Sequence, residues 1–74
     1  MDINVKLVGL FQTGRFKQSH RDYPSTTNVQ DVIDDLDLPQ QHFGIVLING
    51  VHADVDTLLS EGDHLVLMPV IDGG

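Results

Sequence analysis

The last two residues of this 74-residue chain, Gly73 and Gly74, are the part of the sequence best suited to take part in chemistry. Glycine makes up about 7% of protein residues, so about 0.5% of chains would end in two glycines by chance. Because glycine has no Cβ, this pair can pass through a narrow channel and carry the terminal carboxylate into another protein's active site. An α-carboxyl group has a pKa of about 3.5, so it is ionised at neutral pH and must be activated before a nucleophile can attack it. Joining the carboxylate to AMP would provide this activation.

The chain lacks the groups that would activate this carboxylate by itself. It contains no cysteine, no glycine-rich phosphate-binding loop and no paired nucleophile and base. We therefore predict a carrier or small subunit rather than an enzyme. No cofactor is expected to bind this chain, and the activating partner is expected to use ATP and Mg²⁺.

Other polar residues are predicted to solvate the surface rather than to form a second site. Asp54 and Asp56 begin like a calcium-binding loop, but Leu58 occupies the next ligand position. Asp34 and Asp35 point in different directions from a predicted helix, which disfavours a paired-carboxylate mechanism. The histidines have no short ligand spacing, so no metal site is predicted. These histidines are His20, His42, His52 and His64.

The composition indicates a small globular domain with an acidic surface. The chain is 41% hydrophobic, and its formal net charge is −7. All four basic residues precede Asp22, and ten of the eleven acidic residues lie from Asp22 onward. Such a surface repels nucleic acid and anionic lipid, and it favours a partner with Lys or Arg around its docking site. Alternatively, the acidic residues only keep the protein in solution.

The sequence indicates no membrane segment and no secretory signal. Its apolar runs are too short to span a bilayer, and the N-terminus lacks a basic region followed by an apolar stretch. We therefore expect a cytoplasmic protein without a membrane partner.

The N-terminal half predicts two strands followed by one helix. Residues 3–11 alternate like a strand buried on one face, and residues 16–23 follow Gly14 as a hairpin partner. Thr27 and Gln30 have the spacing of a capping box at the start of a helix. The helix is expected to end near Asp37, because a proline two residues later disfavours helical geometry. Its apolar face consists of Val29, Val32, Ile33 and Leu36.

The C-terminal half predicts three further strands. Residues 45–48 form an apolar run that ends in the Asn49-Gly50 hairpin signal, and residues 51–55 return from it. Residues 65–68 are predicted to form a strand that is buried on both faces.

Pro69 is expected to end regular pairing, which gives a domain of residues 1–69 and a flexible tail of residues 70–74. One helix is available to cover one face of the sheet, so the order of elements predicts an α+β roll. Phe11, Phe16 and Phe43 are candidates for an exposed docking patch on the uncovered face, although core positions are expected for all three.

Two segments of the C-terminal half, Ile48-Asn49-Gly50 and residues 58–74, resemble the MoaD/ThiS sulfur carriers, which are prokaryotic relatives of ubiquitin. The most specific parts of the resemblance are the turn at Gly62-Asp63 and the terminal Gly73-Gly74. The resemblance implies a β-grasp fold with a mixed sheet of four to five strands and one main helix on one face.

The resemblance also implies a function for the tail. Gly74 would be adenylated by a ubiquitin-activating-type adenylyltransferase, converted to a thiocarboxylate and used to donate sulfur. The acceptor would be a synthase large subunit or a thiazole synthase-like protein. Pro69-Val70 resembles the molybdopterin synthase small subunit, and Val70-Ile71 resembles the thiamine carrier, so the tail alone does not choose between the two pathways. Because of Pro69, we place the molybdopterin or tungsten-pterin pathway slightly ahead of thiamine.

The remaining tail residues are expected to bind the partners. Val70 and Ile71 follow Pro69, where little core is left to join, so burial in a partner groove is at least as favourable as packing within the domain. Gly73 and Asp72 complete this partner-binding segment. Asp72 places a charge where such carriers usually have a small neutral residue, which favours a dedicated activating enzyme that offsets the charge.

Two other functions fit the same sequence. Activated Gly74 could form an isopeptide bond with a lysine of a target, which would make the protein a ubiquitin-like modifier. In the other reading, the chain is a non-catalytic β-grasp interaction module and its terminal glycines are incidental.

Overall fold

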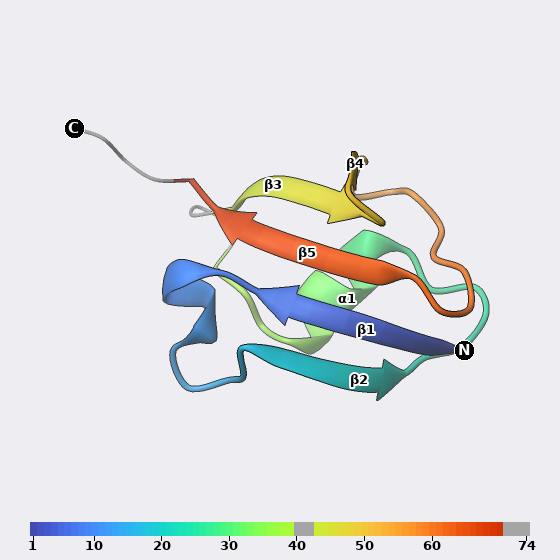
Figure 1. Ribbon diagram of the computed structural model, residues 1–74, viewed down its shortest axis with the longest axis horizontal. Helices are drawn as coiled ribbons and strands as arrows, with labels where there is room; N and C mark the ends of the chain where they lie inside the picture. The colour runs from blue at the N-terminus through green and yellow to red at the C-terminus, as the bar shows by residue number, and fades with distance from the viewer. Residues whose placement is uncertain (40–42, 71–74) are drawn as a thin grey trace.

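The computed structural model describes residues 1–39 and 43–70. The β-strands in this part of the chain form one mixed sheet with the order β2-β1-β5-β3-β4 (Figure 1). The central strands β1 and β5 are parallel, and the other neighbouring strands are antiparallel. The α+β prediction of a mixed sheet with one main helix is therefore confirmed. The elements are β1 (Asp2–Leu7), η1 (Gly9–Gln12), β2 (Gln18–Asp22), α1 (Val29–Asp35), β3 (Phe43–Ile48), β4 (Val51–His52) and β5 (His64–Pro69).

The first strand is shorter than predicted. It ends at Leu7, and the chain turns into the 3₁₀ helix η1 instead of continuing to residue 11. This turn allows Phe11, at 0% exposure, to enter the core from the end of the sheet. The prediction of one strand over residues 3–11 was wrong because burying the Phe11 ring stabilises a turn there more than continued pairing would.

The capping box of α1 lies one residue later than predicted. Asn28, not Thr27, is the N-cap, and its side-chain oxygen accepts a hydrogen bond from the backbone N of Asp31 at 2.8 Å. Asp31 Oδ2 accepts in return from the backbone N of Asn28 at 3.0 Å. Thr27 is buried, and its backbone N–H donates to Pro24 O, so it closes the preceding turn instead.

Replacing Asn28 with Ala should lower the free energy of unfolding by about 1 kcal/mol, because the N-terminus of α1 loses a side-chain acceptor. Urea denaturation followed by circular dichroism measures this change. The exposed Thr26, two residues earlier, serves as the control. A Thr26→Ala variant as unstable as Asn28→Ala would contradict the assigned cap.

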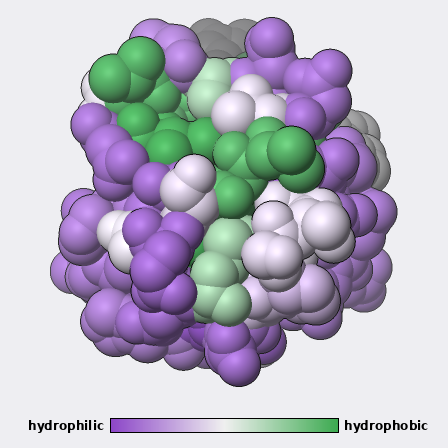
Figure 2. Space-filling view, turned by 90° about the vertical axis from the view of Figure 1, so that its right-hand side faces the viewer, coloured by the Kyte–Doolittle hydropathy of each residue, from purple (hydrophilic) through white to green (hydrophobic). Residues whose placement is uncertain are grey.

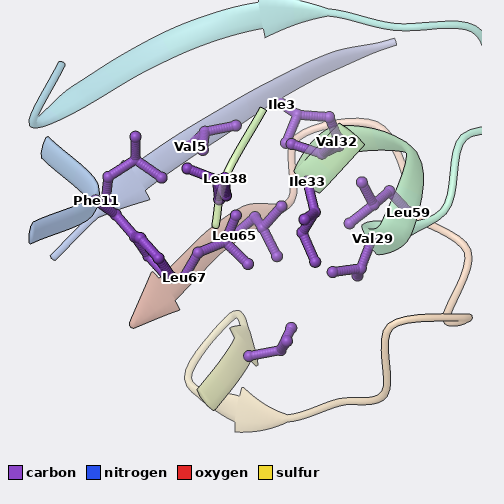
Figure 3. Close-up of a cluster of buried hydrophobic side chains, with 12 residues drawn as sticks. Ile3, Val5, Phe11, Val29, Val32, Ile33, Leu38, Leu59, Leu65 and Leu67 are labelled. Carbon is purple, nitrogen blue, oxygen red and sulfur yellow. The ribbon is translucent and has the colours of Figure 1, made fainter. Parts of the chain in front are cut away.

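The core lies between α1 and one face of the sheet. Val29, Val32 and Ile33 of the helix pack toward β1 and β5, whose alternate side chains point at the helix (Figure 3). The helix face was predicted correctly from the apolar spacing. The buried core residues are Ile3, Val5, Leu7, Phe11, Val29, Val32, Ile33, Leu38, Val46, Leu59, Leu65 and Leu67.

The predicted hairpin at Asn49-Gly50 is confirmed, since both residues have positive φ angles, 52° and 82°. Its second strand, β4, stops at His52 and does not reach residue 55. The following backbone turns to the start of α1 instead, where Gln30 N–H donates to Val55 O at 2.7 Å.

The last strand, β5, differs from its prediction in two ways. Pro69 belongs to β5 and lies opposite Phe43, whereas regular pairing was expected to end before it. A proline is tolerated there because it terminates the strand and removes only one donor. Burial on both faces was also expected, but Val66 and Met68 are only half-buried, because no helix within residues 1–39 and 43–70 covers their face of the sheet.

Candidate functional site

The helix α1 lies on one face of the sheet, and we call the opposite face the open face (Figure 1). Apolar side chains form a strip on this open face. Since Leu65 and Leu67 point into the core, Val66 and Met68 of β5 must point outward. The register of β3 brings Leu47 opposite Val66 and Ile45 opposite Met68. Four apolar side chains from the two strands therefore lie together on the open face.

The strip continues into a groove of about 430 Å³ at the C-terminal end of β5. Val70 is the last described residue, and its 51% exposure leaves an apolar side chain at the edge of this groove. The groove is lined by Val8, Gly9, Gly44, Ile45, Met68, Pro69 and Val70. An apolar surface thus adjoins the point from which the chain continues toward its C-terminus.

The structure places Val70 but none of the other predicted tail residues. Ile71, Asp72, Gly73 and Gly74 lie outside the described residues, so their roles stay predictions. The boundary between a domain of residues 1–69 and a tail of residues 70–74 also stays a prediction.

None of the three phenylalanine side chains is fully exposed, so they do not form the exposed docking patch that was considered. Phe11 is fully buried, and its ring stacks on Phe43 at a centroid distance of 6.2 Å. Phe43 and Phe16 are half-buried and pack against the core. The core prediction is therefore confirmed for Phe11 and holds in part for the other two.

Gly44 is a positioning residue that the sequence analysis missed. It lies where the pairing of β3 with β5 shifts register between Phe43 and Ile45. A Cβ at this residue would lie 2.8 Å from Val70 N and 3.0 Å from Pro69 C. Only glycine lets β3 approach the backbone at the start of the tail this closely. A glycine immediately before an apolar β-branched run was the signal available in the sequence.

Replacing Gly44 with Ala should displace Val70 and lower the free energy of unfolding by about 1–3 kcal/mol, because the backbone of β5 must move. Two-dimensional NMR would detect the displacement as a shift of the Val70 amide, and urea denaturation would measure the stability. An Ile45→Ala variant shortens a neighbouring groove residue without adding a Cβ, and it should cost less than about 1 kcal/mol. An unchanged Val70 amide in Gly44→Ala would contradict the close approach.

A second group of exposed apolar residues lies at the opposite end of β5. Val51 is in the β3–β4 hairpin and Leu58 is in the loop before β5. Figure 2 views the molecule from this end and shows hydrophobic surface among hydrophilic side chains. Because β5 runs away from this end, the groove beside Val70 is the apolar surface nearest to the tail.

No metal-binding group of three His, Asp or Glu side chains occurs within residues 1–39 and 43–70. His20, His52 and His64 come from three different strands, and His42 lies outside the described residues. In the loop that resembled a calcium site, Asp54 N–H donates to Thr57 Oγ1 at 3.2 Å, which closes a turn.

The adjacent helix carboxylates have separate partners. Asp34 accepts a hydrogen bond from Gln30 Nε2 at 2.9 Å, whereas Asp35 accepts one from Tyr23 Oη at 3.0 Å. Burial, and then the bond to Asp35, raise the pKa of Tyr23 above its usual value. The two carboxylates therefore point apart, as predicted.

The α-helix in the described residues, with seven residues, is far too short to cross a membrane.

Solved structures with the same fold include small proteins from archaea and bacteria. SAMP1 from Haloferax volcanii is 26% identical, with a TM-score of 0.77 and full coverage of both chains. A putative molybdopterin converting factor subunit 1 from Pyrococcus furiosus is 20% identical, with a TM-score of 0.77 over 96% of this chain and 99% of that one. Subunit 1 of the molybdopterin-converting factor from Helicobacter pylori, solved in complex with subunit 2, is 17% identical, with a TM-score of 0.67 over both full chains. These matches confirm the ubiquitin-like β-grasp fold.

A search of curated protein sequences gave no significant match. The model of the ThiS family, in contrast, matches residues 5–74, which is nearly the whole chain. It includes the N-terminal half, where the sequence resembled the sulfur carriers only in its pattern of elements. The protein therefore belongs to the ThiS family of the MoaD/ThiS β-grasp sulfur carriers.

Proposed function

We propose that this protein is a cytoplasmic sulfur carrier whose C-terminal carboxylate, on Gly74, is adenylated and then converted to a thiocarboxylate. The main support from the structure is the apolar groove that adjoins Val70 at the end of β5. Gly74 is the fourth residue after Val70, and four extended residues span at most about 14 Å. A partner that covers the groove would therefore receive the carboxylate in an active site about 14 Å or less from the docking surface.

The chemistry requires two steps in the activating partner. The Gly74 carboxylate attacks the α-phosphorus of ATP, which forms an acyl adenylate and releases pyrophosphate. Hydrosulfide, or its equivalent from a sulfur donor, then attacks the carbonyl carbon and AMP leaves, so the products are the thiocarboxylate, AMP and a proton. The partner adenylyltransferase supplies the ATP and Mg²⁺ site, and this chain supplies the acyl group.

The acceptor of the sulfur is proposed to be a synthase large subunit in molybdopterin or tungsten-pterin synthesis. The Helicobacter pylori fold relative was solved with such a second subunit, which supports this class of partner. A thiazole synthase-like acceptor in thiamine synthesis is the alternative, and the ThiS family match supports it equally. Pro69 at the end of β5 is the reason for placing the pterin pathway first.

Protein modification is the second candidate function. SAMP1, which is 26% identical to this chain, is a small archaeal modifier protein. In this role the activated Gly74 carbonyl would be attacked by a lysine amine, and the product would be an isopeptide bond.

Intact-mass spectrometry tests these functions on one sample. The full chain is incubated with ATP, Mg²⁺, a sulfide source and the adenylyltransferase of the source organism. An AMP adduct, followed by a mass gain of one sulfur-for-oxygen exchange, is the result expected for a sulfur carrier. Covalent adducts with other proteins would favour the modifier. An unchanged mass, with the enzyme active on another carrier, would leave the interaction module as the better account.

A further inference from the structure

Arg15 joins two parts of the fold that lie far apart in the sequence, the segment that contains η1 and the end of α1. Its Nε donates a hydrogen bond to Leu36 O at 2.8 Å, and its Nη2 donates one to Asp37 O at 2.7 Å. Its Nη1 donates to Thr13 O at 3.2 Å and to Phe11 O at 3.4 Å. The guanidinium group therefore binds four backbone carbonyl groups, two on each side.

The side chain of Arg15 acts as a helix cap and not as an ion-pair partner. Leu36 is the C-cap residue of α1, and Asp37 follows it with a positive φ of 52°. The last carbonyl groups of a helix lack partners within the helix and carry partial negative charge, so a cation is stabilising there. None of the ion pairs within residues 1–39 and 43–70 includes Arg15. Its planar group is thus used to hold the backbone.

The segment that Arg15 holds also forms one wall of the groove at the C-terminal end of β5. Val8 and Gly9 line this groove, and Gly9 is the first residue of η1. A Cβ on Gly9 would lie 3.5 Å from Pro69 Cγ, and Val8 N–H donates to Leu67 O at 3.2 Å. In Figure 1, η1 lies at the end of the molecule toward which β5 points. A displacement of η1 would therefore change the shape of the groove.

Few other contacts hold η1 in place. A 3₁₀ helix of four residues is marginal by itself, and no side chain caps its N-terminus. The buried Phe11 ring anchors its middle, and Gln12 Nε2 donates to Leu7 O at 3.0 Å. Among the hydrogen bonds of the described residues, only those of Arg15 tie this segment to α1. Removal of the guanidinium group therefore leaves η1 attached to the sheet but not to the helix.

We propose that Arg15 is a positioning residue for the activation of Gly74, because it holds η1 against the end of α1 and so keeps the groove in the shape that the adenylyltransferase binds. The proposal rests on the sulfur-carrier function, since it concerns the surface from which the tail enters the activating enzyme. Arg15 acts through Val8 and Gly9. A mobile wall lowers the fraction of molecules with a binding-competent groove, which raises KM and leaves the chemical step unchanged.

Three variants separate the position of the guanidinium group from its charge. Arg15→Gln removes both. Arg15→Lys keeps the charge, but a single ammonium group on a flexible stem cannot reproduce the planar fork that reaches carbonyl groups on both sides. Lys17→Gln is the matched control, because it makes the same charge change two residues later at an exposed side chain.

NMR relaxation tests whether Arg15 holds η1 in the folded protein. In Arg15→Gln and Arg15→Lys, the backbone order parameters of residues 9–13 should fall from about 0.85 toward about 0.6. The β3–β4 hairpin, at the other end of the sheet, should keep its values in both variants. Lys17→Gln should match the wild type throughout. Because order parameters report the folded state, they are insensitive to a uniform loss of stability.

Steady-state adenylation by the adenylyltransferase of the source organism tests the effect on activation. It is measured at a temperature where circular dichroism shows that each variant is folded. The KM for the carrier should rise at least about fivefold in Arg15→Gln and Arg15→Lys, with kcat within about twofold of the wild type. Lys17→Gln should change KM by less than about twofold.

Several results would overturn the role of Arg15. They are unchanged order parameters in Arg15→Gln, an unchanged KM despite a mobile η1, wild-type behaviour of Arg15→Lys, and equal KM values for Lys17→Gln and Arg15→Gln. The absence of an AMP adduct on the wild type would instead reject the sulfur-carrier function, and the proposed effect on activation with it.

Discussion

A chain that ends at Gly73 should form the acyl adenylate at least about a hundredfold more slowly than the full chain, because the reacting carboxylate is withdrawn by one residue. One extended residue spans about 3.5 Å, whereas reacting atoms must approach to about 3–3.5 Å. The carboxylate of the shortened chain would therefore fall short of the α-phosphorus of ATP when the groove is docked. Intact mass after a fixed time with ATP and the adenylyltransferase measures the adduct.

This deletion is informative because it should leave the folded domain intact. The last core residue is Leu67, seven residues before the deletion. The unfolding midpoint and the binding affinity for the adenylyltransferase should therefore match those of the full chain within error. Undiminished adenylation of the shortened chain would show that the carboxylate of Gly74 is not the working group.

Replacing Phe11 with Ala should destabilise the fold by about 3–5 kcal/mol, since a fully buried ring is removed and a cavity remains. A 74-residue domain has a total free energy of unfolding of about 4–11 kcal/mol. The substitution should thus remove a large part of this free energy, and the loss of the stacked Phe43 contact should loosen β3 beside the groove. Urea denaturation followed by circular dichroism gives the change in stability.

Leu10→Ala is the matched control for this substitution. Leu10 is the preceding residue of η1, but its side chain is 44% exposed, so its truncation should cost less than about 1 kcal/mol. Equal losses in the two variants would mean that η1 contributes to stability as a unit and that the Phe11 ring has no special role.

Local sequence patterns predicted the elements that depend on near neighbours. The apolar spacing of Val29, Val32 and Ile33 identified the buried face of α1, since a helix repeats every 3.6 residues whatever it packs on. The Asn49-Gly50 pair identified the hairpin because both residues readily adopt positive φ. Errors were concentrated at the ends of elements, as at residues 8–11 and 53–55, where contacts with distant segments decide whether a strand continues.

The sequence by itself predicted that any acyl chemistry would use the C-terminal carboxylate, because the chain has no cysteine and no phosphate-binding loop and carries the Gly73-Gly74 pair. The tertiary structure alone decided which surface adjoins Val70, where the described residues end. Gly44 touches the backbone of Val70 only because β3 and β5 pair. His20 and His64 flank Asn4 only because strands from both halves of the chain pair with β1. Such contacts depend on strand order and register, which are set by the burial of the whole core, and no local spacing in the sequence encodes them.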